Sequence, residues 1–299
     1  MSLTSYLSDK EHQVLRDKFK TEFTKPKFEF YNNLIAPPLT LNYGIIGTAF
    51  DYLLRFYIQF QNKGKFIDTN SWVAESGFSG LKIALSNDAK KVSAISKRFE
   101  DIKKYHSIFI KKGKITDELI AGSLFLAKLD LFVRSRMIAP DLLFEEKLDI
   151  QDLKNLYSGL DEKLFSANDR CILNPIFGEG SLLVGGADAD LILDDTLIDI
   201  KVTKNLKLER DYLNQIIGYY ILSLIGDINF QYERKTIKYV AIYFARHSFL
   251  WKIPILELGD YTKIENFKNW FIDYFEEYKI ERQKTLKIKI SNRRIQRES

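Results

Sequence analysis

GGADADLILDDTLIDIK, residues 185–201, is the stretch that decides the expected fold. Two largely apolar runs in it flank the short polar segment Asp194-Asp195-Thr196. Apolar runs of this length on either side of a tight polar turn are typical of a β-hairpin. We therefore expect two antiparallel strands, at residues 181–193 and 197–202.

The turn also sets which side chains face one another, because side chains alternate between the two faces of a strand. A turn at residues 194–195 places Asp190 opposite Asp199. Asp188 then lies opposite Lys201, and all four side chains share one face. Opposed like charges destabilise a hairpin unless something compensates them, and a divalent cation held by oxygen ligands does so. The hairpin thus predicts a metal site formed by Asp188, Asp190 and Asp199 beside Lys201.

A plainer interpretation of the same residues is an ordinary hairpin with one face in water. Half-exposed strands commonly carry charge on the outer face, and Lys201 would then form a cross-strand salt bridge. The pair Gly185-Gly186 argues against this, because glycines weaken a strand and often mark a bulge or the close approach of a ligand.

The acid-x-Lys pattern of Asp199 and Lys201 does not discriminate by itself. Other copies occur in the chain, among them Asp101/Lys103, Glu145/Lys147, Asp152/Lys154, Asp161/Lys163 and Glu277/Lys279. Only the copy at Asp199 lies in an apolar strand that follows a second strand carrying acids. Its context therefore singles it out.

The run VGGADADLILDDTLIDIKVTK, followed by NQIIGYY, resembles the core of RecB-like members of the PD-(D/E)XK nuclease superfamily. Residues 185–188, 199–201 and 215–219 match the family elements G-x-x-D, (D/E)-x-K and Q-x-x-x-Y, in that order. The resemblance implies a restriction-endonuclease-like core, with a mixed central β-sheet flanked by helices. It also implies that two of the acids bind the metal and that Lys201 assists the attacking water.

The same resemblance places Gln215 and Tyr219 beside the site, on the helix that follows the hairpin. Helical spacing supports this independently, because the two residues are four apart and share a face with Gly218. A small residue at position 218 would let this helix lie close to the hairpin.

The sequence departs from the family pattern at two points. Asp188 satisfies G-x-x-D by spacing, whereas Asp190 better fits an aspartate that leads directly into apolar strand residues, so either one could be the metal ligand. RecB-like enzymes also often carry G-x-x-x-H in an early helix. The counterpart here runs from Gly47 to Asp51, with aspartate in place of histidine. Asp51 could still be a ligand, but we expect an aspartate on a helix surface.

The rest of the chain predicts an α/β protein whose N-terminal half is largely helical. The first forty residues, ending in Ala36-Pro37-Pro38, indicate an arm. Apolar spacing then predicts helices from residue 42 and at 90–110, 117–133, 150–160, 210–225 and 267–278, and a strand at 237–245. We expect one domain over residues 1–278, with a helical portion at 1–170, the catalytic hairpin and helix at 175–226, and a closing strand and helix at 237–278. Residues 279–299 would form a basic tail.

Composition limits the kind of metal site that the chain can form and indicates its cellular compartment. A single cysteine, Cys171, and three scattered histidines make a zinc site improbable, so carboxylates must hold any metal. The apolar runs are too short for a membrane span and the first residues do not form a signal peptide, which makes the cytosol the expected compartment.

Charge is distributed unevenly along the chain. Residues 90–114 carry nine basic residues against two acidic ones, and residues 279–299 carry eight against two, although the net charge of the whole chain is only +5. Such patches suit a polyphosphate partner, and a solvated helix face with a basic disordered tail is the alternative.

These features together predict a Mg²⁺-dependent nuclease that hydrolyses phosphodiester bonds in DNA, with Mn²⁺ as a substitute metal. The site residues would be Asp188, Asp190, Asp199, Lys201, Gln215 and Tyr219. The alternative is a non-catalytic nucleic-acid-binding module that keeps the nuclease fold. The sequence has no P-loop and no H-E-x-x-H element, so ATP hydrolysis and zinc peptidase chemistry lack support.

Overall fold

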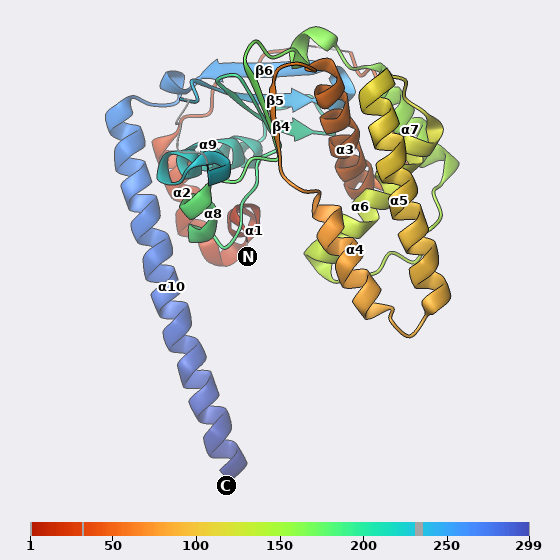
Figure 1. Cartoon of the computed structure of the whole chain (residues 1–299). Coiled ribbons are helices and arrows are strands. Elements are labelled where there is room, and N and C mark those ends of the chain that lie inside the picture. The colour runs from red at the N-terminus through yellow and green to blue at the C-terminus, as the bar shows by residue number, and fades with distance from the viewer. Residues whose placement is uncertain (1, 32, 231–235, 299) are drawn as a thin grey trace.

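A six-stranded mixed sheet forms the centre of the molecule (Figure 1). The computed structural model describes residues 2–31, 33–230 and 236–298, and of residues 230 and 285–298 it describes the backbone only. The strands lie side by side in sequence order: β1 Phe66–Thr69, β2 Arg170–Leu173, β3 Leu191–Leu193, β4 Thr196–Lys201, β5 Tyr239–Phe244 and β6 Phe249–Pro254. The pairs β1/β2 and β4/β5 are parallel and the other three are antiparallel. The expected α/β class with a mixed sheet is confirmed.

Helices dominate the chain before β2, as expected. They are α1 Leu3–Ser8, α2 Gln13–Glu22, α3 Tyr43–Gln61, α4 Val73–Ala84, α5 Ala89–Lys112, α6 Asp117–Ser135 and α7 Lys147–Ser158. After β2 come α8 Gly178–Leu183, α9 Arg210–Ile225 and α10 Tyr261–Glu298. Short 3-10 turns lie at Lys10–His12, Glu162–Phe165, Ile228–Phe230, Ala245–His247 and Ile255–Glu257. The predicted helix at 210–225 agrees with α9 residue for residue.

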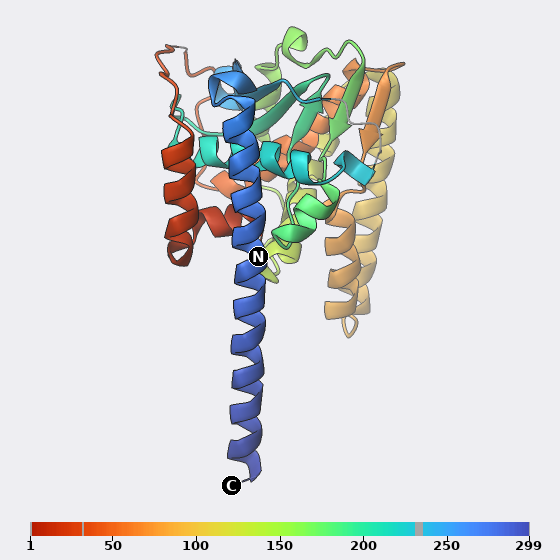
Figure 2. The same ribbon diagram turned by 90° about the vertical axis from the view of Figure 1, so that its left-hand side faces the viewer.

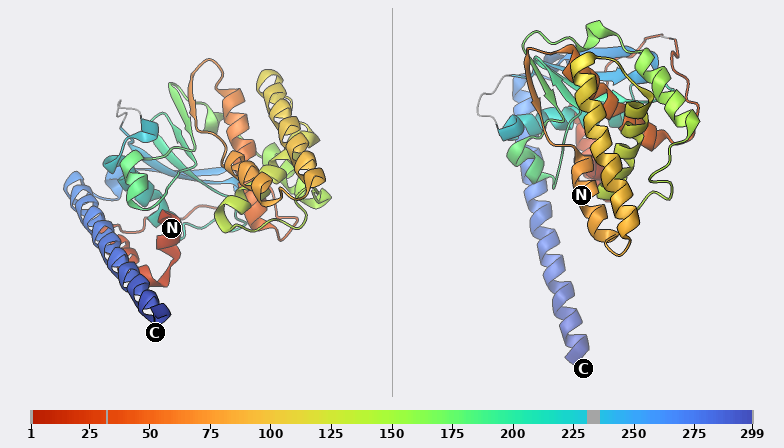
Figure 3. Two further views of the ribbon diagram at one scale, coloured as in Figure 1. Left: turned by 60° about the horizontal axis from the view of Figure 1, so that its bottom comes forward. Right: turned by 45° about the vertical axis from the view of Figure 1, so that its right-hand side comes forward.

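The sheet is covered on both faces because its strands bury alternate residues on opposite sides. Ile198 of β4 and Tyr243 of β5 belong to a core shared with α3, α5, α6 and α7. Their neighbours Leu197 and Ile242 belong to a second core shared with α1, α2, α9 and α10. Figure 1 and the left view of Figure 3 show the two groups of helices on opposite sides of the strands. Strands buried on both faces explain the nearly continuous apolar sequence of β4 and β5.

The first residues do not form an arm, so that prediction is wrong for residues 3–23. Leu3, Leu7, Leu15 and Phe19 are buried in the second core, against α9 and α10. Their four-residue spacing is a helical signal. The Phe19 and Phe267 rings lie 4.8 Å apart, edge to face, which joins α2 to the start of α10.

The hairpin has the predicted turn but a shorter first strand. Leu193 pairs with Thr196 across a turn at residues 194–195, as expected. The predicted strand at 181–193 is wrong in its first part, because residues 178–183 form α8 and β3 begins only at Leu191. Gly185 and Gly186 have φ angles of 72° and 133°, which favour glycine. The glycine pair therefore turns the chain after α8 and does not mark a strand bulge.

A buried ion pair joins the turn between β5 and β6 to the N-terminal half. Arg246 and Asp152 are 1% and 0% exposed, and both guanidinium nitrogens contact the carboxylate, at 2.7 and 3.0 Å. Arg246 also donates to the Ala36 carbonyl, and Asp152 accepts from the Leu39 N–H. The pair thus ties the 35–39 segment, α7 and the end of β5 together.

The C-terminal residues continue α10, which reaches well past the rest of the molecule (Figure 2). The predicted tail at 279–299 is therefore a helical extension as far as Glu298, and its basic side chains after Lys284 lie outside the described side chains. None of the helices, as far as the chain is described, combines the length and apolarity needed to cross a membrane.

Candidate active site

Two of the predicted site residues form an ion pair at the end of β4. Asp199 is 1% exposed, and its Oδ2 lies 2.7 Å from Nζ of Lys201. Both side chains point toward α9, because they alternate with Ile198 and Ile200, which pack on the other core. The strand therefore presents one acid and one cation to the same helix.

That helix supplies the remaining two motif residues. Lys201 Nζ donates to Gln215 Oε1 at 2.8 Å, and Gln215 Nε2 donates to the Tyr219 hydroxyl at 3.0 Å. The Lys201 ammonium also lies 4.9 Å from the centre of the Tyr212 ring, a cation–π contact that the sequence did not suggest. The structure thus joins Asp199, Lys201, Gln215 and Tyr219 in one continuous network.

Gly218 serves a different purpose from the one expected. A Cβ built on Gly218 would lie 2.8 Å from Leu3 Cδ2, so its missing side chain makes room for α1. The prediction that Gly218 lets α9 approach the hairpin is therefore wrong. The N-terminal helix instead supports α9 from behind the network.

Lys201 keeps its proton in this environment. Burial disfavours the charged ammonium, but Asp199 and Asp190 outweigh burial and raise the pKa of Lys201 above its ordinary value. An ammonium whose pKa is raised can orient a water or neutralise negative charge, and it is a poor general base.

Asp190 lies immediately before the start of β3, near the Asp199–Lys201 pair. The Ile200 N–H donates to Asp190 Oδ2 at 2.6 Å, so the side chain accepts a bond from the neighbouring strand. Burial, followed by the charges of Asp199 and Asp51, raises the pKa of Asp190 well above its ordinary value. Asp190 is thus the carboxylate that connects the network at β4 with the residues on α3.

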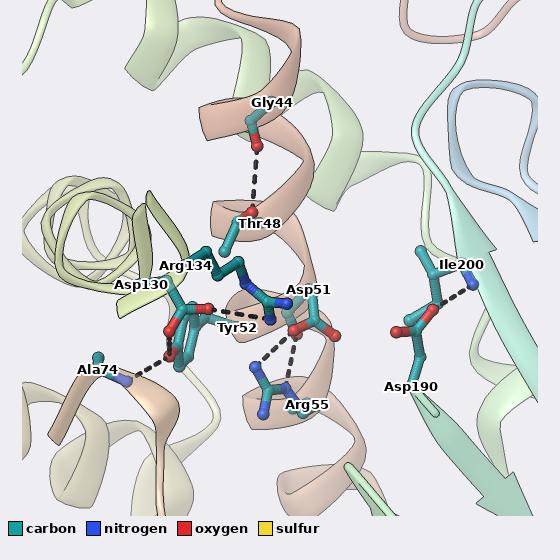
Figure 4. A network of polar contacts seen from close by, with 10 residues as sticks. All are labelled: Gly44, Thr48, Asp51, Tyr52, Arg55, Ala74, Asp130, Arg134, Asp190 and Ile200. Carbon is teal, nitrogen blue, oxygen red and sulfur yellow. Dashed lines mark hydrogen bonds and ion pairs between the residues drawn. The ribbon is translucent and has the colours of Figure 1, made fainter. Parts of the chain in front are cut away.

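A cavity of about 190 Å³ opens between the hairpin, α3 and α6. Asp51, Asp188 and Asp190 all line it, and Figure 4 shows Asp51 on α3 across from Asp190. The interpretation of Asp51 as an ordinary helix-surface aspartate is therefore wrong. Asp188 lines the cavity too, and its backbone bridges Ile176, whereas the pairing of β3 with β4 ends at Leu191 and Ile198 and does not extend to Asp188 and Lys201.

The two carboxylate oxygens of Asp51 differ in their hydrogen-bond partners. Its Oδ2 accepts from Arg55, whereas its Oδ1 is buried and, among the described residues, has no hydrogen-bond donor. Burial raises the pKa of Asp51, Arg55 lowers it, and Asp188 raises it further, with a net upward shift. A buried carboxylate oxygen without a donor is an open ligand position for a cation.

A second polar group on α6 completes the wall of the cavity (Figure 4). Buried Asp130 accepts from the Tyr52 hydroxyl at 3.2 Å, and that hydroxyl accepts from the Ala74 N–H at 3.1 Å. Arg134, one helical turn after Asp130, approaches its other oxygen at 3.7 Å. The sequence showed Asp130 and Arg134 only as an i, i+4 pair, which is common on helices and does not indicate a site.

The carboxylates that line the cavity are the kind of ligand that a hard cation prefers, but they are not gathered around one point. Within residues 2–31, 33–230 and 236–298, no group of three or more His, Cys, Asp or Glu side chains is spaced to hold a metal ion. Mg²⁺ is usually bound through one or two carboxylates, with waters and phosphate oxygens as its other ligands. Asp190 together with the open Oδ1 of Asp51 fits that mode of binding.

The basic segment on α5 forms an ordered stripe that lies away from this cavity. Lys90, Lys97, Lys104 and Lys111 are exposed, and their seven-residue spacing places them along one face of the helix. α5 packs on α3, α4 and α6, on the side remote from the sheet (Figures 1 and 3).

Comparison of this chain with protein-family models, with curated proteins and with solved structures gave no match in any of the three searches.

Proposed function

We propose that this chain is a Mg²⁺-dependent nuclease with a restriction-endonuclease-like core, which hydrolyses phosphodiester bonds in DNA. The observation that carries the proposal is the buried Asp199–Lys201 pair. Lys201 is hydrogen-bonded to Gln215, and Asp190 lies at the adjacent strand end. The order D-x-K then Q-x-x-x-Y in the sequence thus corresponds to one connected group of side chains, which supports the resemblance to RecB-like nucleases.

Asp190 and Asp51 would hold the metal, with Asp188 and Asp199 as the other nearby carboxylates. A bound Mg²⁺ lowers the pKa of its water and offsets negative charge on the phosphate, with Mn²⁺ able to replace it. Lys201 keeps its charge beside Asp199, and orients the attacking water or stabilises the charge that develops on the phosphate. Gln215 fixes the Lys201 ammonium through Oε1, and Tyr219 fixes the Gln215 amide.

The alternative is a nucleic-acid-binding module that keeps this fold without catalysis. Such a module is expected to lack an acid or the lysine, and the chain retains the Asp199–Lys201 ion pair with Asp190 close enough for its charge to act on both side chains. This connection favours the enzyme over the binding module.

The direct test is to incubate the purified chain with linear and circular DNA in Mg²⁺, and in EDTA. We expect cleavage in Mg²⁺ alone, and no cleavage by Asp190→Asn. The asparagine Oδ1 can still accept from Ile200, so the fold should persist. Removing one of several crowded carboxylates should raise the melting temperature at neutral pH by a few degrees. Equal cleavage by both proteins would contradict the assignment, and DNA binding by an uncleaving wild type would favour the module.

Asp51 provides a separate test of the metal site. Asp51→Asn should weaken Mg²⁺ binding about ten- to a hundredfold, because the open Oδ1 loses its charge, and calorimetric titration without DNA measures this. Asp117→Asn, which removes an exposed carboxylate paired with Lys154, is the matched control and should bind Mg²⁺ like the wild type. Unchanged affinity in the Asp51 variant would remove α3 from the site.

A further inference from the structure

The cavity is lined by more acidic than basic side chains, which opposes the entry of a negatively charged phosphodiester. Its described lining carries four carboxylates, on Asp51, Asp130, Asp188 and Asp190, and two guanidinium groups, on Arg55 and Arg134. This excess of negative charge repels a phosphate unless a cation meets it at the entrance. The two arginines are therefore the side chains of the lining to consider first.

Arg55 is already engaged inside the wall. Its side chain is 8% exposed, donates to the Asp51 carboxylate and lies 4.5 Å from the centre of the Tyr52 ring. Moving it toward a substrate would leave Asp51 buried without its cation, which is costly. Arg55 is therefore a fixed part of the acidic wall.

Arg134 has the opposite character. Its side chain is 60% exposed, and its contact with Asp130 is 3.7 Å long, beyond hydrogen-bond distance. The planar guanidinium can bind two phosphate oxygens at once and is only weakly hydrated, so a loosely held arginine is well suited to a phosphodiester.

Asp130 sets the position of the Arg134 guanidinium in the absence of substrate. The Asp130 side chain is 4% exposed and is fixed by the Tyr52 hydroxyl, which is itself fixed by the Ala74 N–H. This chain of bonds connects α3, α4 and α6 and keeps the acceptor in place. Arg134 is thereby held at the edge of the cavity that it lines.

We propose that Arg134 binds a backbone phosphate of the DNA substrate at the entrance of this cavity, with Asp130 as its positioning residue. The inference rests on the proposed nuclease function and names a substrate contact for it. The phosphate replaces Asp130 as the partner of the guanidinium when the substrate enters.

The test compares Arg134→Gln and Arg134→Lys with Arg136→Gln, an exposed arginine two residues further on that does not line the cavity. We measure kcat and KM for DNA cleavage in Mg²⁺, and the anisotropy of a short fluorescent DNA in Ca²⁺. Arg134→Gln should raise KM and Kd about ten- to a hundredfold with little change in kcat, because the contact exists before and during the reaction. The KM and Kd values of Arg134→Lys should lie between those of wild type and those of Arg134→Gln. The values of Arg136→Gln should stay within about twofold of wild type.

A calorimetric titration with Mg²⁺ in the absence of DNA separates this role from a structural one. Arg134→Gln should bind Mg²⁺ at least as tightly as wild type, because a nearby positive charge has been removed. Weaker Mg²⁺ binding, or KM and Kd values that match those of Arg136→Gln, would overturn the inference. An uncleaving wild type whose DNA binding depends on Arg134 would overturn the nuclease proposal and leave the phosphate contact standing.

Discussion

Lys201→Met should lower the rate of DNA cleavage at saturating substrate by roughly a hundred- to a thousandfold, as loss of one preorganised charge donor does in other enzymes. The ammonium lies between Asp199 and Gln215, so methionine removes both the ion pair and the hydrogen bond. Rates of cleavage measured in Mg²⁺ with excess DNA test this directly.

The control must separate lost chemistry from lost stability, because Lys201→Met leaves Asp199 buried without its partner. The double variant Asp199→Asn/Lys201→Met removes that charge and should recover much of the melting temperature while staying inactive. Lys238→Met, which breaks an exposed pair with Asp195 at the start of β4, is the matched lysine control and should cleave normally. Activity that returns together with stability in the double variant would assign Lys201 a structural role.

Arg246→Met should destabilise the fold by about 3–5 kcal/mol, because it leaves the Asp152 carboxylate in the core without a cation. For a chain of this size the melting temperature should fall by roughly 5 to 15 °C. Thermal or urea unfolding followed by circular dichroism measures the change. The active-site distances do not involve this pair, so cleavage at low temperature should be nearly normal.

The double variant Asp152→Leu/Arg246→Met tests whether charge or packing accounts for that loss. Replacing both partners with apolar side chains should recover a large part of the stability, although the Leu39 N–H loses its acceptor. A double variant as unstable as the sum of the two single variants would mean that the two side chains stabilise the fold independently, and that no orphaned charge accounts for the loss.

Local pattern was enough to predict the elements whose signals lie within a few residues. The turn at 194–195 and the helix at 210–225 follow from short spacing rules, and both agree with the structure. The resemblance and the helical spacing placed Gln215 beside the site on the following helix, and the structure joins it to Lys201 by a hydrogen bond. These features depend little on the rest of the chain.

Other features depend on contacts between distant segments. Asp51 lines the same cavity as Asp190 only because α3 packs against the sheet. The spacing of Asp51 from Gly47 in the sequence therefore could not distinguish a surface position from a site. The short strands β1 and β2 were missed because four residues carry too little periodicity. Asp152 shows the converse, since its acid-x-Lys pattern resembles that of Asp199 but leads to a buried structural pair.

The packing of Leu3 into the gap at Gly218 also affects the order in which the chain can fold as it is synthesised. Residues 3–23 leave the ribosome long before α9, and the second core further requires Phe267, Phe271 and Phe275 of α10. The apolar residues on one face of the sheet therefore stay uncovered until nearly the whole chain has emerged and α10 can pack on them. Contacts of such long sequence separation slow folding and prolong exposure to aggregation. Synthesis at low temperature or with chaperone holdases should therefore improve the yield of folded protein more than changes to the N-terminal helical half.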